Sequence, residues 1–216
     1  KFRRNLVLKN LLENDFITPE NYASLKEKEI DLKKTKKIYL EDAQYYIEDV
    51  RKNIIEQLSY EKVYKQGFNI NTPINLNLQK IATKSLRDGL VSYDKRKGWH
   101  GVLTNKIYDS NWINDLENFS LEKSLGWDIA IVRSIDKFSV DIETTNRIKG
   151  QIDFKEVSWV KKDFEEFLKT GDIIYVEKIR DNKFSLRQIP KVNGGIVVMD
   201  PYTGRVLALS GGFSFK

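Results

Sequence analysis

The pattern that most constrains the fold is a series of short β-type runs between about residue 127 and residue 188. In the clearest run, Phe138, Val140 and Ile142 alternate with polar residues, which is typical of a strand with one buried face. Four further runs predict strands at 129–132, 148–154, 173–177 and 184–189. Between the third and fourth strands, residues 157–168 change to helical spacing. The order is therefore three strands, a short helix and two more strands.

Turn-forming residues separate the last two of these strands from what precedes them. Gly171 and Asp172 stand before the fourth strand, and Asp181 and Asn182 stand before the fifth. Three strands, a helix and two strands in this order predict a small five-stranded Greek-key barrel of the OB type. We therefore expect residues 101–194 to form an OB-like β-barrel domain.

The end of the chain predicts a separate β-hairpin. An apolar run, 196–200, leads into Pro201-Tyr202-Thr203-Gly204, and a second apolar run starts at Arg205. Proline presets φ at the first corner of a turn and glycine closes it. Both faces of the two strands are apolar, as in a strand buried between two layers. We expect one face to pack on a helix at 78–93, and the other to stay an exposed apolar surface. The expected helix contacts are Ile81, Leu86 and Leu90.

The first hundred residues have mainly helical patterns. Helices are expected at 4–14, after Thr18-Pro19-Glu20, at 43–58 and at 78–93. A basic connector at 31–40 is expected to be a solvated link. Residues 67–72 alternate and end at Pro73, which predicts a strand at a sheet edge. The lone histidine, His100, is expected in a loop, without a partner nearby in the sequence.

These patterns give an α+β fold class. A helical N-terminal part and a strand–helix linker are followed by the five-stranded OB-like β-barrel and a C-terminal β-hairpin. The 216 residues are 40% hydrophobic and 31% charged, which is typical of a globular chain. With no cysteine and one histidine, neither a disulfide framework nor a thiolate or imidazole metal centre is expected. We expect no cofactor and no metal ion.

The net charge of +6 raises the alternative of an OB-fold nucleic-acid-binding module. The location of the charge argues against it. Residues 67–100 carry six basic and two acidic side chains, whereas residues 101–194 carry 15 basic and 16 acidic ones. Phosphate binding needs basic groups concentrated on the binding face, and the expected barrel is almost neutral. We expect no nucleic-acid partner, and this module remains the alternative function.

Two short motifs could indicate serine acylation chemistry. Residues 158–161 match Ser-x-x-Lys, and residues 169–171 match Lys-Thr-Gly. However, Ser-x-x-Lys occurs four more times in a chain with 13 serines and 27 lysines, and the third motif of that set, Ser-x-Asn, is absent. The two matches are expected to share one short helix and its end, with Gly171 as the left-handed residue that ends it. We therefore predict no catalytic residue in this chain.

The end of the chain also carries a specific motif. It contains Leu186-Arg187-Gln188-Ile189-Pro190, then Asn193-Gly194-Gly195-Ile196-Val197, and then Asp200-Pro201-x-Thr203-Gly204-Arg205-Val206-Leu207-Ala208. This motif resembles the class A penicillin-binding proteins, most closely the 1A type of Gram-negative bacteria. Phe16-Ile17-Thr18-Pro19-Glu20 is similar to the last helices of the family's glycosyltransferase domain. Tyr45–Arg51, Gly67–Gln79 and Leu90–Trp99 resemble the linker that leads into the transpeptidase domain.

The resemblance implies a division into four segments. Residues 1–66 would be the helical end of the glycosyltransferase domain and linker, and 67–100 the strand–helix linker of the transpeptidase domain. Residues 101–194 would be the OB-like domain of the 1A type, and 195–216 the first hairpin of the transpeptidase domain. Both active sites and the membrane anchor would lie outside this chain.

The resemblance also implies a function for the longer protein. It would polymerise glycan strands from lipid II and cross-link their stem peptides at the periplasmic face of the bacterial inner membrane. This chain would be a non-catalytic spacer and docking module. The expected partners of the barrel are other cell-wall synthesis proteins or outer-membrane regulators.

Overall fold

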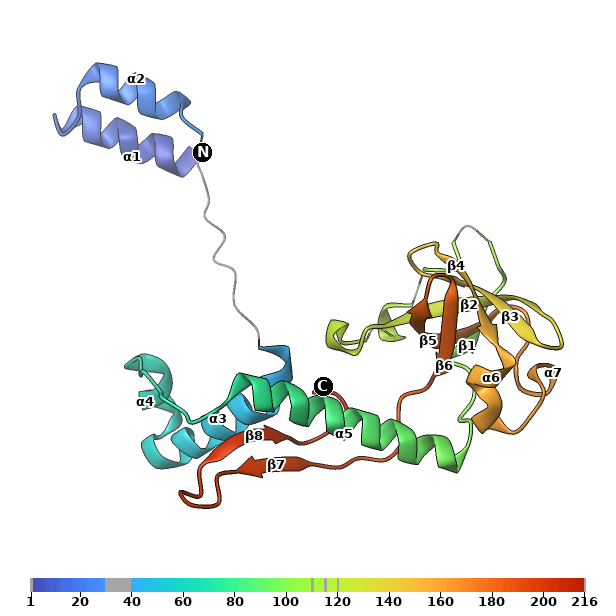
Figure 1. Ribbon diagram of the computed structural model, residues 1–216. Helices are drawn as coiled ribbons and strands as arrows, with labels where there is room; N and C mark the ends of the chain where they lie inside the picture. Colours follow the sequence, from blue (N-terminus) through green and yellow to red (C-terminus); the bar gives the residue numbers. More distant parts are fainter. Residues whose placement is uncertain (1, 30–39, 110, 115, 120, 216) are drawn as a thin grey trace. The chain divides into compact units, whose positions relative to one another are not determined.

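The computed structural model describes residues 2–29, 40–109, 111–114, 116–119 and 121–215 (Figure 1). The chain divides into two compact units, residues 1–39 and 40–216. Apart from Leu40, the expected connector lies outside the described residues.

The first unit contains two helices, α1 (Phe2–Glu13) and α2 (Pro19–Glu27). Both were expected from the sequence. The side chain of Thr18 caps α2 by accepting a hydrogen bond of 3.3 Å from the Asn21 amide. Arg4 on α1 donates to the carbonyl oxygen of Lys26 at 2.7 Å and so ties the two helices together.

The helices of the second unit are α3 (Gln44–Leu58), α4 (Tyr60–Lys65) and α5 (Leu76–Lys97), and a 3₁₀ turn, Glu41–Ala43, precedes α3. The expected helices at 43–58 and 78–93 are confirmed, and α4 is an addition. The longest helix, α5, begins at Asn75, whose side-chain oxygen accepts hydrogen bonds from the amides of Asn77 and Leu78. It ends before Gly98.

The prediction of a strand at 67–72 is wrong. These residues form no ladder with another described strand. Phe68 and Ile70 are 44% and 49% exposed, so the apolar half of the alternation is not buried. Alternation predicts a strand only where a neighbouring strand offers hydrogen bonds, and the described chain supplies none beside this segment.

The barrel is closed by five strands: β2 (Trp127–Ile135), β3 (Ser139–Thr144), β4 (Lys149–Asp153), β5 (Asp172–Arg180) and β6 (Lys183–Arg187). The strand order is β5-β2-β3-β4-β6, and β6 returns to pair with β5. The closing pair, β4 with β6, is parallel and aligns Ile152 with Phe184. A two-residue strand, β1 (Thr104–Asn105), adds to β5. The predicted OB-like barrel is confirmed.

Both faces of the barrel wall are packed. Inside, a core of apolar side chains fills the barrel, with Ala130, Val132, Val140, Ile142, Ile152, Phe184 and Leu186 among its members. Outside, Ile129 and Ile131 of β2 pack against Trp112 and Leu116 from the segment before the barrel strands. Residues of β2 are therefore buried on both sides, which explains its continuous apolar run.

The single helix expected at 157–168 is also wrong. The segment forms three short turns, α6 (Phe154–Val157), η4 (Ser158–Val160) and α7 (Phe164–Phe167). Lys161 adopts a left-handed conformation with φ of 59° and breaks the helix. The apolar spacing still identified core residues, since Val157, Val160, Phe164 and Leu168 are buried in the barrel and Phe167 is partly buried against them.

Gly171 does not end a helix, because α7 ends four residues earlier. Its φ is +90°, and a Cβ atom at this position would lie 2.3 Å from the carbonyl oxygen of Lys106. The amide of Lys106 donates to the carbonyl oxygen of Gly171 at 2.8 Å. Glycine is therefore required for the close approach of the segment that contains β1.

The hairpin expected at the end of the chain is confirmed as β7 (Ile196–Met199) and β8 (Val206–Ser210). In Figure 1 it lies along α5. Leu86 and Leu90 face Gly194, where the chain enters β7. The expected contact through Ile81 is wrong, because Ile81 is 62% exposed.

Polar groups hold the free edge of β8. The side-chain amide of Gln79 forms two hydrogen bonds with the backbone of Leu209, each 2.9 Å long. The Asn75 amide donates to the carbonyl oxygen of Leu207, and the Tyr46 hydroxyl donates to that of Val206. These groups take the place of a neighbouring strand and satisfy an edge that would otherwise be unpaired.

A buried carboxylate fastens the segment before β2 to the barrel. Glu143 on β3 is 3% exposed and accepts a hydrogen bond of 2.7 Å from the Tyr108 hydroxyl. Arg133 and Arg147 form ion pairs with its two oxygens at 3.3 and 3.1 Å. Burial raises the pKa of Glu143, but the hydrogen bonds and the two arginine charges outweigh burial and leave this pKa below its usual value.

Replacing Glu143 by glutamine is expected to lower the free energy of unfolding by about 1–3 kcal/mol at neutral pH. Because the folded-state pKa is lowered, the contribution of Glu143 is present above the ordinary glutamate pKa of 4.5 and disappears as the pH falls through the folded-state value. Urea unfolding should therefore show a difference between wild type and Glu143→Gln that shrinks on acidification. The exposed Glu165→Gln is the control, and a difference independent of pH would contradict the assignment.

Candidate functional site

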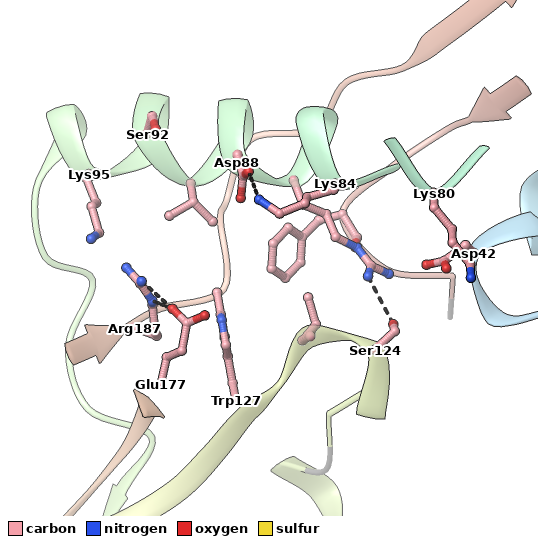
Figure 2. Close-up of a pocket in the computed structure, with 14 residues that line it drawn as sticks. Asp42, Lys80, Lys84, Asp88, Ser92, Lys95, Ser124, Trp127, Glu177 and Arg187 are labelled. Atoms are coloured by element: carbon pink, nitrogen blue, oxygen red, sulfur yellow. Dashed lines mark hydrogen bonds and ion pairs between the residues drawn. The ribbon is translucent and has the colours of Figure 1, made fainter. Parts of the chain in front are cut away.

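The candidate functional site is a cleft between α5 and the barrel (Figure 2). Its volume is about 510 Å³. One wall is α5, which contributes Lys84, Val91 and Lys95, and the other wall includes Trp127, Glu177 and Arg187 of the barrel. Phe213, which follows the hairpin, also lines it. In this cleft α5, the barrel and the segment after the hairpin meet.

A buried carboxylate joins the two walls near the C-terminal end of α5. Asp94 is 1% exposed. One of its oxygens accepts a hydrogen bond of 2.7 Å from Gln188, and the other accepts one of 3.1 Å from the Lys191 amide. The ring nitrogen Nε2 of His100 lies 2.8 and 2.9 Å from the two oxygens. Asp94 therefore contacts the chain both where it enters the barrel and where it leaves it.

His100 lies in a loop, as expected, but the expectation that it has no partner nearby in the sequence is wrong. Its ring contacts Asp94, and its backbone amide donates to the side chain of Gln188 at 3.0 Å. The partner lies six residues back, on the face of α5 turned toward the barrel. Sequence proximity could not reveal this contact, because it depends on the turn at Gly98.

A second group of polar contacts joins the two walls nearer the N-terminal end of α5. Arg87 donates to Glu122 at 2.7 Å, to the Ser124 hydroxyl at 3.0 Å and to the carbonyl oxygen of Phe213 at 2.9 Å. Glu122 in turn accepts hydrogen bonds of 2.7 Å from the Ser214 hydroxyl and the Phe215 amide. Here the barrel contacts both α5 and the segment after the hairpin.

Lys95 occupies the end of the cleft near Asp94. Figure 2 shows its amine pointing toward Arg187 of the barrel. Burial, and then the positive charge of Arg187, lower the pKa of Lys95 to about 8. Arg187 is itself paired with Glu177, and the Lys95 amine lies 5.3 Å from the ring centroid of Trp159. The cleft thus holds a partly desolvated cation.

The two acylation-like motifs do not share a helix, because Ser158 lies in η4 and residues 169–171 lie between α7 and β5. The exposed hydroxyl of Ser158 donates to the carbonyl oxygen of Lys155 at 3.0 Å, and Lys161 forms the turn that follows. Neither residue lines the cleft. Among the described residues, no group of three or more histidine, aspartate or glutamate side chains is placed to hold a metal ion.

The hairpin exposes apolar side chains on β7. Val197 and Met199 are 55% and 56% exposed, and Tyr202 at the turn is 96% exposed. On the other face Ala208 and Ser210 are buried. One packed face and one exposed apolar face are what the sequence predicts for these strands.

Sequence reasoning missed the polar residues that join the parts. Gln79 and Asp94 occupy buried positions of α5 among Ala82, Thr83 and Leu90. A polar residue at a position whose helical neighbours are apolar was the available signal, because burial of such a group requires a partner. The partners near the ends of the barrel domain and on the hairpin, Gln188, Lys191 and Leu209, lie more than 90 positions away and are not visible in the periodicity.

Comparison with known proteins identifies the class. Residues 99–192 match the family model described as the penicillin-binding protein OB-like domain. The whole chain is 36% identical over 221 residues to penicillin-binding protein 1A of Rickettsia prowazekii. It is 25% identical to penicillin-binding protein 1A of Escherichia coli, over 99% of the chain.

A solved structure agrees. The crystal structure of penicillin-binding protein 1A from Haemophilus influenzae matches with a TM-score of 0.66 and 27% identity, over 98% of this chain and 31% of that one. The chain therefore belongs to the penicillin-binding protein family and contains its OB-like domain. Within that family it belongs to the class A proteins of the 1A type.

The chain spans 28% of the length of the Rickettsia relatives and 27% of the Escherichia coli relative. Within the part of the sequence that the structure describes, no helix has both the length and the apolar character needed to cross a membrane.

The state of Lys95 predicts a pH dependence. Between about pH 8 and the ordinary lysine pKa of 10.5, the unfolded chain binds more protons at this residue than the folded chain does. The folded state should therefore gain stability across this interval as the pH rises. Urea unfolding should show that Lys95→Met removes this gain, while the exposed Lys97→Met retains it. Equal pH profiles of wild type and Lys95→Met would refute the burial of this cation.

Proposed function

We propose that this chain is the non-catalytic framework of a bifunctional peptidoglycan synthase. In the longer protein, glycan strands would be polymerised from lipid II and their stem peptides cross-linked. This chain would hold the OB-like barrel in a fixed orientation against α5 and the hairpin. The site of action would be the periplasmic face of the bacterial inner membrane, with the anchor elsewhere in the longer protein.

The observation that carries this proposal is the pair of polar contacts across the cleft. Asp94 contacts both ends of the barrel domain, and Arg87 contacts the barrel and the segment after the hairpin. Such contacts fix an orientation, and the cleft shows no hydrogen-bonded serine–lysine pair among its lining residues. Membership in the penicillin-binding protein 1A family supports the activity of the longer protein.

We further propose that the barrel binds a protein partner, such as another cell-wall synthesis protein or an outer-membrane regulator. Its segment is almost neutral, which disfavours phosphate binding. Its surface carries large apolar side chains exposed by 40% or more, which are Ile107, Phe138, Ile148, Ile179 and Ile189. Exposed apolar groups on a neutral surface suit a protein partner better than a nucleic acid.

The 216-residue chain is expected not to react with β-lactams. Ser158 is exposed and its hydroxyl donates to a backbone carbonyl, so no base activates it. Incubation with a fluorescent penicillin, followed by a denaturing gel, should show no labelled band. A stoichiometric band that is absent in Ser158→Ala would overturn the non-catalytic assignment.

The framework role is tested in the full-length protein with Asp94→Asn. The substitution places a side-chain NH₂ group against donors of His100, Gln188 or Lys191, so the barrel should lose its fixed orientation. Cross-linking of newly made glycan should fall several-fold, while glycan polymerisation from lipid II continues. The matched control is Asp88→Asn, a mainly exposed carboxylate on the α5 wall of the cleft, where the lost ion pair with Lys84 is worth a few tenths of a kcal/mol. Equal cross-linking by both variants would count against the proposal.

A further inference from the structure

Three parts of the second unit meet at Glu122, and a fourth, α3, joins them through Ser214. Glu122 precedes the 3₁₀ turn Lys123–Leu125, which is part of the segment leading into the barrel. One carboxylate oxygen accepts from Arg87 of α5, and the other accepts from the Ser214 hydroxyl and the Phe215 amide. Tyr45 of α3 completes the group by donating to the carbonyl oxygen of Ser214 at 2.8 Å.

The group is largely shielded from water. The side chains of Arg87 and Glu122 are only 12% and 17% exposed. Phe213 is 6% exposed, and its ring lies 5.5 Å from that of Trp127 at the start of β2. Burial, and then the charge of Glu122, raise the pKa of Tyr45. A charge pair in such a place is stable only when its hydrogen-bonding groups are satisfied, and here both carboxylate oxygens are.

The chain after β8 fits closely into this group. The ring of Phe215 meets that of Tyr45 edge to face with centroids 4.9 Å apart. A Cβ atom on Gly212 would lie 2.4 Å from the Tyr45 hydroxyl oxygen. The backbone therefore has little freedom at this point, and the direction in which it continues after Phe213 depends on the position of Glu122.

We propose that Glu122, held by Arg87, is a positioning residue through which the barrel sets the path of Phe213–Phe215. A partner that binds the barrel and moves the Glu122–Leu125 turn would then shift the chain that leaves the hairpin. This inference deepens the proposed function, and only its whole-protein experiment rests on that function. It assigns the transmission of movement from the barrel to the segment after the hairpin to one ion pair, Arg87 with Glu122.

The alternative is that each contact merely adds local packing. Coupling differs from packing because it is reciprocal: a change on either side of Glu122 must be felt on the other. The 216-residue chain allows both directions to be measured by amide exchange in NMR spectra.

In the forward direction, Glu122→Ala should accelerate exchange of the Phe215 amide at least tenfold, since that amide loses its acceptor. Glu122→Gln keeps an acceptor oxygen but loses the charge that holds Arg87, so its effect should be smaller. Exchange should be unchanged in Glu165→Ala, an exposed glutamate of α7. Slow exchange of the barrel amides of Val132 and Val140 in every variant shows that the fold is intact. An unchanged Phe215 amide in Glu122→Ala refutes the proposal.

In the reverse direction, Ser214→Ala removes one donor to Glu122 without touching the barrel. The amides of Leu125 and Gly126, which donate within the turn to Glu122 and Lys123, should exchange several-fold faster. Ser214→Ala removes only one hydrogen bond and is not expected to unfold the barrel. It therefore tests the proposal even if Glu122→Ala fails to fold. No change in the turn means that the contacts are local packing.

In the full-length protein, Glu122→Gln should lower the rate of acylation by a fluorescent penicillin several-fold and leave glycan polymerisation unchanged. Wild-type acylation combined with accelerated exchange at Phe215 would uphold the coupling and contradict the proposed function. Slower acylation without accelerated exchange would contradict the coupling instead.

Discussion

The second unit depends on hydrogen-bonding side chains that α5 places at three levels along one side. Gln79 contacts the hairpin, Arg87 contacts the turn before β2 and the segment after the hairpin, and Asp94 contacts both ends of the barrel domain. They stand eight and seven residues apart, roughly two helical turns in each case. At 1.5 Å per residue, they span about 22 Å of helix. A rigid helix therefore sets the spacing between hairpin and barrel.

Polar contacts of this kind specify geometry more than they add stability. A buried carboxylate such as Asp94 loses its hydration on folding, and hydrogen bonds to His100, Gln188 and Lys191 offset that cost only when all of them form together. An orientation that broke one of them would leave a buried charge without its partner. Apolar packing between α5 and the barrel would tolerate small rotations, whereas these contacts penalise them.

The sequence was informative where one segment's own pattern decides its structure. Alternation at 138–142 and the Pro201–Gly204 turn located the barrel strands and the hairpin, and the spacing of Val157, Val160, Phe164 and Leu168 identified core residues even though no continuous helix forms there. It failed at 67–72, where a strand needs a partner that alternation does not reveal. It placed His100 correctly in a loop but did not reveal the contact with Asp94, because that contact depends on how the chain turns after α5.

In the chain, the barrel stands between α5 and the hairpin that packs on α5. An inserted domain leaves its host undisturbed when its two ends lie close together. Here His100, just after α5, and Gln188 and Lys191, just before the hairpin, all contact one carboxylate, so the chain returns to the place it left. Leu86 and Leu90 of α5 therefore pack against Gly194 at the start of the hairpin, although the barrel separates them in the sequence. Asp94 closes this insertion and Glu122 adds a second contact beyond it, so the barrel has a defined orientation rather than a flexible attachment.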